Sequence, residues 1–189
     1  MVLALAGAAK HMEAFDLSAL LLVGFDTFMR TGELFTLKRG DVSLYRHKAV
    51  LRLHHTKTSQ RKGKDEYVVV GSSVALTALR HVCSLRSAPD QIILGRTVAN
   101  ARMILRELLQ VFNLDPGEFN YYSLRRGGAT SYFYRTGSMS KTLATGRWEN
   151  ASTARMYIED GAAQAGQLSL TDEQLRVLMR AARFLSCPS

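Results

Sequence analysis

Cysteine, proline and long hydrophobic runs are all scarce in this sequence. Its two cysteines, Cys83 and Cys187, have no metal-ligand spacing, so neither a disulfide framework nor a zinc site is expected. The apolar residues 1–9 lack a preceding basic segment and are too few to span a membrane. We interpret them as the first helix of the fold or the remnant of a junction with an upstream domain. These features favour an intracellular location, nuclear in a eukaryote and in the nucleoid or cytoplasm of a prokaryote.

Motifs for nucleotide and metal binding are also missing. No Gly-x-x-x-x-Gly-Lys segment is present, so the sequence predicts no nucleotide cofactor. Among the five histidines, His54 and His55 are adjacent and would point to opposite faces of a strand, while the other three have no partner at ligand spacing. We therefore expect no metal and no other cofactor.

Positive charge, by contrast, is abundant. The 189 residues contain 25 Lys and Arg against 16 Asp and Glu, a formal net charge of +9. An excess of this size is typical of proteins that bind a polyanion, and nucleic acid is the leading candidate. The alternative is an ordinary basic protein without such a partner. The hydrophobic content of 47% is enough for one compact domain with a core, but the chain is too short for two full-sized domains.

Hydrophobic periodicity predicts a mainly α fold with a small antiparallel β-sheet, an α+β arrangement. Residues 48–55 and 66–70 favour strands, and the basic segment between them is predicted to form a hairpin tip. In the helix predicted over 97–112, Met103 lies on the core side. The small residues 161–166 have the composition of a flexible linker. Further helices are predicted over 16–28, 34–37, 74–85, 123–134, 138–143 and 171–185, and another begins near residue 150.

Several side chains suited to phosphate chemistry are spread along the chain. Cleavage of a phosphodiester without metal needs a nucleophile, cations for the non-bridging oxygens and an acid for the leaving oxygen. Tyr157, in the helix predicted to begin near residue 150, has a hydroxyl that can form a covalent phosphotyrosine. Arginine offers paired donors and a fixed charge, which favours Arg30 and Arg125 as phosphate ligands. The alternatives are a core tyrosine and ordinary surface charges.

The order of these residues resembles the active-site series in the catalytic domain of the tyrosine recombinase (phage integrase) family. That family carries Arg, Lys, His-x-x-Arg, His or Trp, and a Tyr nucleophile. The resemblance extends from about residue 20 to Tyr157. It implies the fold of that domain and an enzyme that cuts and rejoins DNA, in recombination or integration, through a covalent 3′-phosphotyrosyl intermediate. The matching residues here are Arg30, Lys57, Tyr122, Arg125, Trp148 and Tyr157.

The resemblance also implies a role for each residue. Arg30 and Arg125 would hold the scissile phosphate, and Tyr157 would attack its phosphorus atom. Lys57 would protonate the leaving 5′ oxygen from a hairpin tip that delivers it when DNA is bound. Glu33, three residues after Arg30, would orient that arginine or brace the helix junction. The alternative for this pair is an ordinary surface ion pair.

Two positions of the series carry aromatic residues. Trp148 stands where histidine is more frequent; its indole N–H can donate to the phosphate while its ring packs under the Tyr157 helix, and the alternative is a core tryptophan. Tyr122 departs from the family pattern, which has histidine. A phenol has an ordinary pKa near 10, against about 6.5 for imidazole, so Tyr122 exchanges protons less readily near neutral pH. A slip of one residue would place Tyr121 in the site instead.

Further basic residues are candidates for contacts with DNA. Three of them follow Lys57 in the predicted hairpin tip, where they contact phosphates or remain solvated. Arg126 contacts an adjacent phosphate or faces solvent. The Tyr122 variant and the glycine pair 127–128 resemble mobile-element recombinases of eukaryotes more than the bacterial chromosome enzymes. The three tip residues are Arg61, Lys62 and Lys64.

We expect a catalytic domain over residues 1–160, followed over 161–189 by a flexible linker and a C-terminal helix. By resemblance, this helix docks on a neighbouring protomer, or it packs on its own domain. We expect this sequence to lack the N-terminal core-binding domain that the family carries. The expected partners are double-stranded DNA and further copies of the chain, as a dimer or tetramer, with no membrane. The alternatives are a recombinase-like DNA-binding module with weak or lost catalysis, a type IB topoisomerase-like enzyme, and a basic helical protein without phosphate chemistry.

Overall fold

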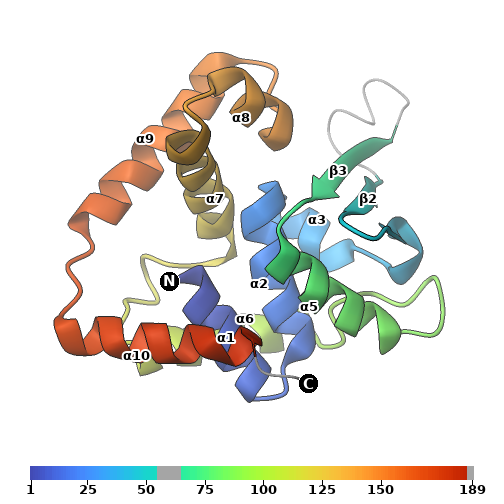
Figure 1. Cartoon of the computed structure of the whole chain (residues 1–189), viewed down its shortest axis with the longest axis horizontal. Helices are drawn as coiled ribbons and strands as arrows, with labels where there is room; N and C mark the ends of the chain where they lie inside the picture. The colour runs from blue at the N-terminus through green and yellow to red at the C-terminus, as the bar shows by residue number, and fades with distance from the viewer. Residues whose placement is uncertain (55–64, 187–189) are drawn as a thin grey trace.

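The computed structural model describes residues 1–54 and 65–186 (Figure 1). Lys57, Arg61, Lys62, Lys64 and Cys187 lie outside these ranges. The described chain is mainly helical with a small antiparallel sheet, which confirms the predicted fold class. Its elements are α1 (Val2–His11), α2 (Phe15–Thr27), α3 (Thr31–Thr36), η1 (Arg39–Asp41), β1 (Val42–Leu44), β2 (Ala49–Leu53), β3 (Glu66–Val70), α5 (Ser73–Ser84), α6 (Val98–Val111), α7 (Tyr121–Thr136), α8 (Met139–Gly146), α9 (Ala151–Gln167), α10 (Asp172–Arg183) and η2 (Phe184–Ser186).

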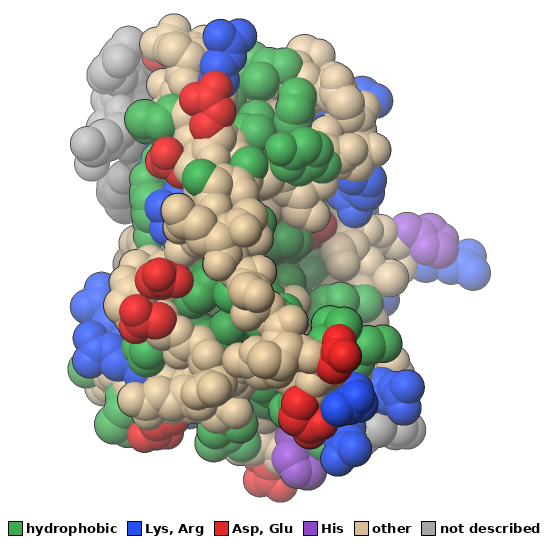
Figure 2. All heavy atoms as spheres, turned by 90° about the vertical axis from the view of Figure 1, so that its left-hand side faces the viewer, with side chains coloured by type: hydrophobic (Ala, Val, Ile, Leu, Met, Phe, Trp, Pro, Cys, Tyr) green, Lys and Arg blue, Asp and Glu red, His purple; other side chains and the backbone are tan. Residues whose placement is uncertain are grey.

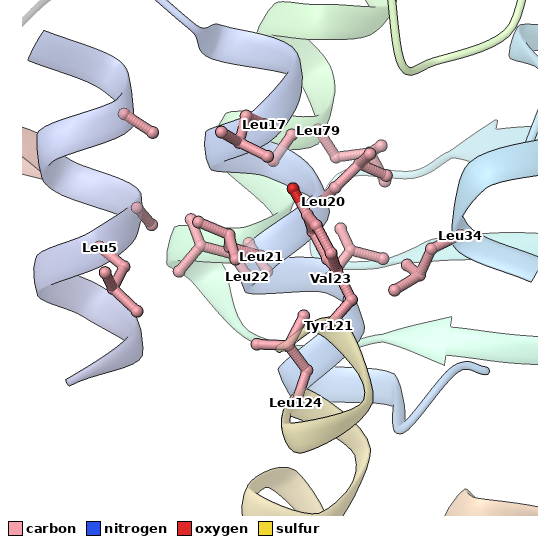
Figure 3. Packing of buried hydrophobic residues seen from close by; sticks show 14 of the residues in the cluster. Leu5, Leu17, Leu20, Leu21, Leu22, Val23, Leu34, Leu79, Tyr121 and Leu124 are labelled. Carbon is pink, nitrogen blue, oxygen red and sulfur yellow. The ribbon is translucent and has the colours of Figure 1, made fainter. Parts of the chain in front are cut away.

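The helix α2 lies at the centre of the fold. It is apolar on all sides, as expected of a helix that other elements surround, and α1, α5 and α7 pack against it. Figure 3 shows Leu5 of α1, Leu79 of α5 and Leu124 of α7 in the cluster around it. Each fully buried leucine contributes about 1.5–3 kcal/mol, so α2 is a firm support for the residues that follow it. Its buried leucines and valine are Leu17, Leu20, Leu21, Leu22 and Val23.

The strands pair in the order β1-β2-β3, with both neighbouring pairs antiparallel. The strands predicted over 48–55 and 66–70 are present as β2 and β3, with Val50 opposite Val69 and Arg52 opposite Tyr67. The strand β1 was not predicted, because its three residues are too few to show alternation. Leu51 is fully buried while Tyr67 and Val69 are exposed, so one face of the sheet packs on the core.

Two predictions of local structure are wrong. Residues 161–166 continue α9 instead of forming a flexible linker, because alanine favours a helix and Gly161 lets α9 approach α7 closely. A Cβ at Gly161 would overlap the Oγ1 atom of Thr130 on α7. Met103 is half exposed, whereas its predicted partner Leu105 is buried. Residues two positions apart in an α-helix are separated by about 200° around its axis, so the side chains of Met103 and Leu105 point to opposite sides.

The last helix, α10, packs on α1 of the same chain. Leu178 and Ala181 are its buried residues, and Gly7 of α1 lies against the backbone of Ala181. Beyond α10, the rings of His11 and Phe184 stack with their centroids 4.2 Å apart. The helix therefore has a docking surface within its own domain, and docking on a neighbouring protomer stays a prediction.

The face formed by α9 and α10 is hollowed, and Figure 2 shows hydrophobic side chains in the recess. The recess has a volume of about 300 Å³ and is lined by residues such as Leu21, Phe25 and Leu109. This apolar lining is unsuited to phosphate chemistry. Among the described residues, no helix is long and apolar enough to cross a membrane.

Replacing Gly128 with alanine is expected to lower the free energy of unfolding by about 1–3 kcal/mol, because the new methyl group forces α2 and α7 apart. Its Cβ would overlap the carbonyl oxygen of Phe25 and lie 2.8 Å from Cδ1 of Phe28. The matched control is Gly127→Ala, whose Cβ would meet only the Phe25 ring at 3.4 Å. Urea unfolding of both variants checks this, and equal stability would contradict the assigned helix contact.

Candidate active site

Arg125 lies in the first turns of α7 and is the most deeply buried charged residue of the site, with 1% of its surface exposed. Its guanidinium donates to the carbonyl oxygen of Phe28 and, at 2.9 Å, to that of Gly146. These carbonyls end α2 and α8, and the negative end of a helix dipole favours a cation. Both helices end in left-handed residues, Phe28 with φ of 52° and Arg147 with φ of 55°. Two strained turns thus hold one guanidinium, a pattern typical of functional sites.

The electrostatic setting of Arg125 favours an anion. Burial, with the nearby charges of Arg30 and Arg147 as the next causes, lowers the pKa of this guanidinium to about 10. Arg125 is still charged at neutral pH. Its Nε atom is buried and has no hydrogen-bond partner among the described residues. Three clustered cations with an unused donor would be stabilised by a bound phosphate.

Trp148 forms an aromatic platform beside Arg125. The guanidinium carbon of Arg125 lies 4.6 Å from the Trp148 ring centroid and 5.5 Å from that of Tyr157. The Trp148 and Tyr157 rings stack with centroids 5.0 Å apart and an interplanar angle of 27°. Trp148 follows α8 and Tyr157 lies in α9, so this stack joins the two helices to the buried arginine.

Tyr122 contacts the candidate nucleophile directly. Its hydroxyl donates to the Tyr157 hydroxyl oxygen at 2.6 Å. Partial burial, with this hydrogen bond as the next cause, raises the pKa of Tyr122 to about 12, so it remains a donor at neutral pH. Tyr121 instead donates to the carbonyl of Ala101 at 3.1 Å, and burial raises its pKa above the usual range. Figure 3 shows Tyr121 in the core, so Tyr122 is the tyrosine in the site.

Arg30 and Glu33 form the opposite wall of the site. Arg30 precedes α3, and the Glu33 carboxylate accepts its backbone N–H at 2.8 Å and its Nη1 at 2.9 Å. Burial would raise the pKa of Glu33, but the hydrogen bonds and charges of Arg147 and Arg30 outweigh it and hold the pKa below its usual range. Glu33 is therefore ionised at neutral pH. The Arg30 side chain is 39% exposed, so it can reach a ligand.

Arg147 belongs to the site and was missed by the sequence reasoning. Its side chain is 9% exposed and pairs with Glu33 at 2.6 Å and with Glu66 at 2.9 Å. In the sequence, Arg147 lies between Gly146 and Trp148 at a predicted helix end, and this position was the available signal. The family series contains the tryptophan but not the residue before it. Glu66, which is far from Arg147 along the chain, is not among the residues of the family series.

Basic grooves lie on both sides of α3. One, about 560 Å³, contains Arg102, Arg106 and Tyr122. The other, about 660 Å³, contains Arg30, Lys38 and Arg52 together with the carboxylates of Glu33 and Asp41. From the sequence, no role was assigned to Arg102 or Arg106. The first groove reaches Thr31 at the start of α3 and the second contains Arg30, so both border this end of α3. Their positive side chains suit a phosphate backbone.

Arg126 faces the same region. Its guanidinium carbon lies 5.8 Å from the Tyr122 ring centroid, and its Nη2 donates to Gln164 at 3.3 Å. It is half buried, and its contact with an adjacent phosphate or with solvent stays a prediction.

The structure thus brings together five of the six residues in the predicted catalytic series, while Lys57 lies outside the described ranges. In residues 1–54 and 65–186, no group of three or more His, Cys, Asp or Glu is placed to hold a metal ion. The assembled site offers two phenols and several guanidinium groups. The five residues of the predicted catalytic series that lie together are Arg30, Tyr122, Arg125, Trp148 and Tyr157.

No protein-family model matches the sequence, and a search of curated proteins finds no match. Among solved structures, the chain is similar to the XerA recombinase, with a TM-score of 0.64 and 21% identity over 96% of this chain and 63% of that one. It is also similar to the XerH site-specific recombinase bound to its difH substrate before cleavage, with a TM-score of 0.62, 15% identity, and 82% of this chain against 46% of that one.

The post-cleavage complex of XerH with palindromic difH gives a TM-score of 0.61 at 14% identity, over 80% of this chain and 44% of that one. This chain spans less than two thirds of the length of the recombinases it matches, from 44% to 63%. At these identities the likeness concerns the fold. The described helices and the small antiparallel sheet have the fold of the catalytic domain of tyrosine recombinases.

Proposed function

We propose that this domain cleaves and rejoins DNA strands through a covalent 3′-phosphotyrosyl intermediate on Tyr157. The observation that carries the proposal is the convergence of α7, α8 and α9 on one point, where the Tyr157 ring lies 5.5 Å from the buried Arg125 guanidinium. A phenol beside a buried cation is suited to attack a phosphodiester, because the cation binds the phosphate and offsets its negative charge.

In the proposed reaction, Tyr157 Oη attacks the phosphorus and forms the P–O bond to tyrosine while the bond to the 5′ oxygen breaks. The proton of the Tyr157 hydroxyl passes to solvent. The leaving 5′ oxygen takes a proton from Lys57, the role that the sequence predicts for it. Attack by a free 5′ hydroxyl reverses the steps and rejoins a strand, with no external energy source.

Each described side chain has a part in this scheme. Arg30 and Arg125 bind the non-bridging phosphate oxygens, and Tyr122 holds the Tyr157 oxygen through the 2.6 Å hydrogen bond. The Trp148 ring, stacked 5.0 Å from the Tyr157 ring, keeps the nucleophile from swinging away. The guanidiniums of Arg102, Arg106 and Arg126 supply contacts to neighbouring phosphates.

Double-stranded DNA is the proposed partner. The net charge of +9 and the two basic grooves beside the site support it. The XerH recombinase is similar in fold and was crystallised with its difH substrate. Recombination joins ends from two duplexes, so we also propose that copies of the chain associate on DNA as a dimer or tetramer.

The proposal is tested by covalent capture. The protein is incubated with nicked duplexes whose central segment is randomised, so that cleavage releases a short fragment and traps the adduct. DNA that stays attached to the protein in detergent is amplified and sequenced, which also reveals the preferred site. We expect an enriched sequence; salt-sensitive DNA binding without any attached DNA would overturn the enzyme and support the second candidate.

That second candidate is a DNA-binding module without efficient cleavage. Tyr122 favours it, because a phenol with a pKa of about 12 cannot accept a proton near neutral pH as a histidine can. The same capture experiment separates the two candidates, since both predict DNA binding and only one predicts an adduct.

Tyr122→His is expected to change the pH dependence of cleavage. In the wild type, the Tyr122 hydroxyl stays protonated up to its pKa of about 12, so it adds no inflection near neutral pH. An imidazole titrates near about pH 6.5, and only its neutral form can accept the Tyr157 proton. The single-turnover rate of the variant should therefore rise through that pH. The measurement compares the single-turnover rates of both proteins from roughly pH 5.5 to 8. Superimposable rate profiles would contradict proton transfer between residue 122 and Tyr157.

A further inference from the structure

Arg147 joins three elements of the site through one guanidinium group. It follows α8, its Nη2 pairs with Glu33 of α3 at 2.6 Å, and its Nη1 pairs with Glu66 at 2.9 Å. Nη1 also donates to the other Glu33 oxygen at 3.2 Å. Glu66 is the first residue of β3, so the cluster ties the sheet to the two helices.

The same carboxylate that receives Arg147 also receives Arg30. Glu33 accepts the Arg30 backbone N–H at 2.8 Å and the Arg30 Nη1 at 2.9 Å. Arg147 is 9% exposed and uses both terminal nitrogens on carboxylates, whereas Arg30 is 39% exposed. Arg147 is therefore placed to hold Glu33, and Arg30 is the member of the pair that can reach a phosphate.

We propose that Arg147 is a positioning residue, which fixes the Glu33 carboxylate and through it the direction of the Arg30 guanidinium. Glu66 anchors Arg147 from the other side. The left-handed backbone of Arg147, with φ of 55°, aims its side chain back toward α3 while its neighbour Trp148 packs under Tyr157. The turn at residues 147–148 thus orients side chains on both sides of the site, Glu33 through Arg147 and Tyr157 through Trp148. This inference rests on the proposed function, because Arg30 is a phosphate ligand only in that reaction.

The experiment separates positioning from simple stabilisation. Arg147→Met leaves Glu33 with Arg30 as its ion-pair partner and leaves Glu66 without one among the described residues, so both stability and cleavage should fall. Adding Glu66→Gln removes one of those charges and should restore part of the lost melting temperature. The double variant should still cleave about 10–100-fold more slowly than wild type, because Glu33 and Arg30 remain unfixed. A purely stabilising role predicts that cleavage recovers together with stability.

Two further variants sharpen the test. Arg147→Lys keeps the charge but lacks the fork that reaches two carboxylates, so its cleavage rate should lie between those of wild type and Arg147→Met. Arg176→Met is the matched control, because Arg176 pairs with Glu173 at 2.7 Å on an exposed part of α10. It should cleave like the wild type.

A readout without DNA keeps the inference distinct from the proposed function. The NMR resonance of the Arg30 Nε–H group, assigned by its loss in Arg30→Lys, should shift and broaden in Arg147→Met but not in Arg176→Met. If wild type forms no adduct but this resonance changes, the proposed function fails and the positioning of Arg30 by Arg147 stands. An unchanged resonance, or wild-type cleavage by the double variant, overturns the inference.

Discussion

Replacing Tyr157 with phenylalanine is expected to abolish the covalent protein–DNA adduct while leaving DNA affinity near that of the wild type. The change removes one oxygen atom, and the ring that stacks on Trp148 at 5.0 Å is retained. Loss of the nucleophile removes the chemical step itself, so adduct formation should fall by at least about 10³-fold. Single-turnover capture on a nicked duplex and a salt titration of DNA binding provide the two measurements.

The neighbouring hydroxyl of Tyr122 requires its own control, because it lies 2.6 Å from that of Tyr157. Tyr122→Phe should slow adduct formation without abolishing it, and the double variant should form none. Mass spectrometry of the captured protein locates the attached nucleotide. Tyr134→Phe, at a tyrosine that is 70% exposed on α7, is the matched control and should cleave normally. An adduct that persists in Tyr157→Phe and maps to Tyr122 would reassign the nucleophile.

Replacing Arg125 with lysine is expected to reduce both cleavage and stability. The guanidinium donates to the carbonyls of Phe28 and Gly146, and its carbon lies over the Trp148 ring, 4.6 Å from the ring centroid. An ammonium group is a point charge that cannot reproduce these paired directions and still present donors to a phosphate. Removing one such preorganised donor set typically costs about 10²–10³-fold in rate.

The stability effect of Arg125→Lys should be about 1.5–3 kcal/mol in the free energy of unfolding, the value of a hydrogen bond to a charged group. Urea unfolding measures it, and single-turnover cleavage measures the rate. Arg135→Lys is the control, since Arg135 is exposed near the end of the same helix. If Arg125→Lys cleaved at the wild-type rate, the buried guanidinium would not be a phosphate ligand.

Much of the local structure could be predicted from the sequence. The helix around Leu20 and the strands over 49–53 and 66–70 follow from hydrophobic periodicity, which depends only on neighbouring residues. The predicted linker over 161–166 failed, because the fit of Gly161 against Thr130 is a contact between helices that composition does not encode. The exposure of Met103 follows from the same periodicity, because Met103 lies off the i, i+3, i+4, i+7 series that the buried residues beginning at Leu105 form.

The sequence by itself determined the kinds of chemistry available to this protein: its basic charge, its ordered arginines and tyrosines, and the departure at Tyr122. Only the tertiary structure decided how these groups are arranged. It selected Tyr122 over Tyr121, buried Arg125 between two helix ends, and added Arg147 to the site. The physical reason is that residue type is local, whereas burial and hydrogen-bond partners depend on elements far apart in the chain, as Arg147 and Glu33 show.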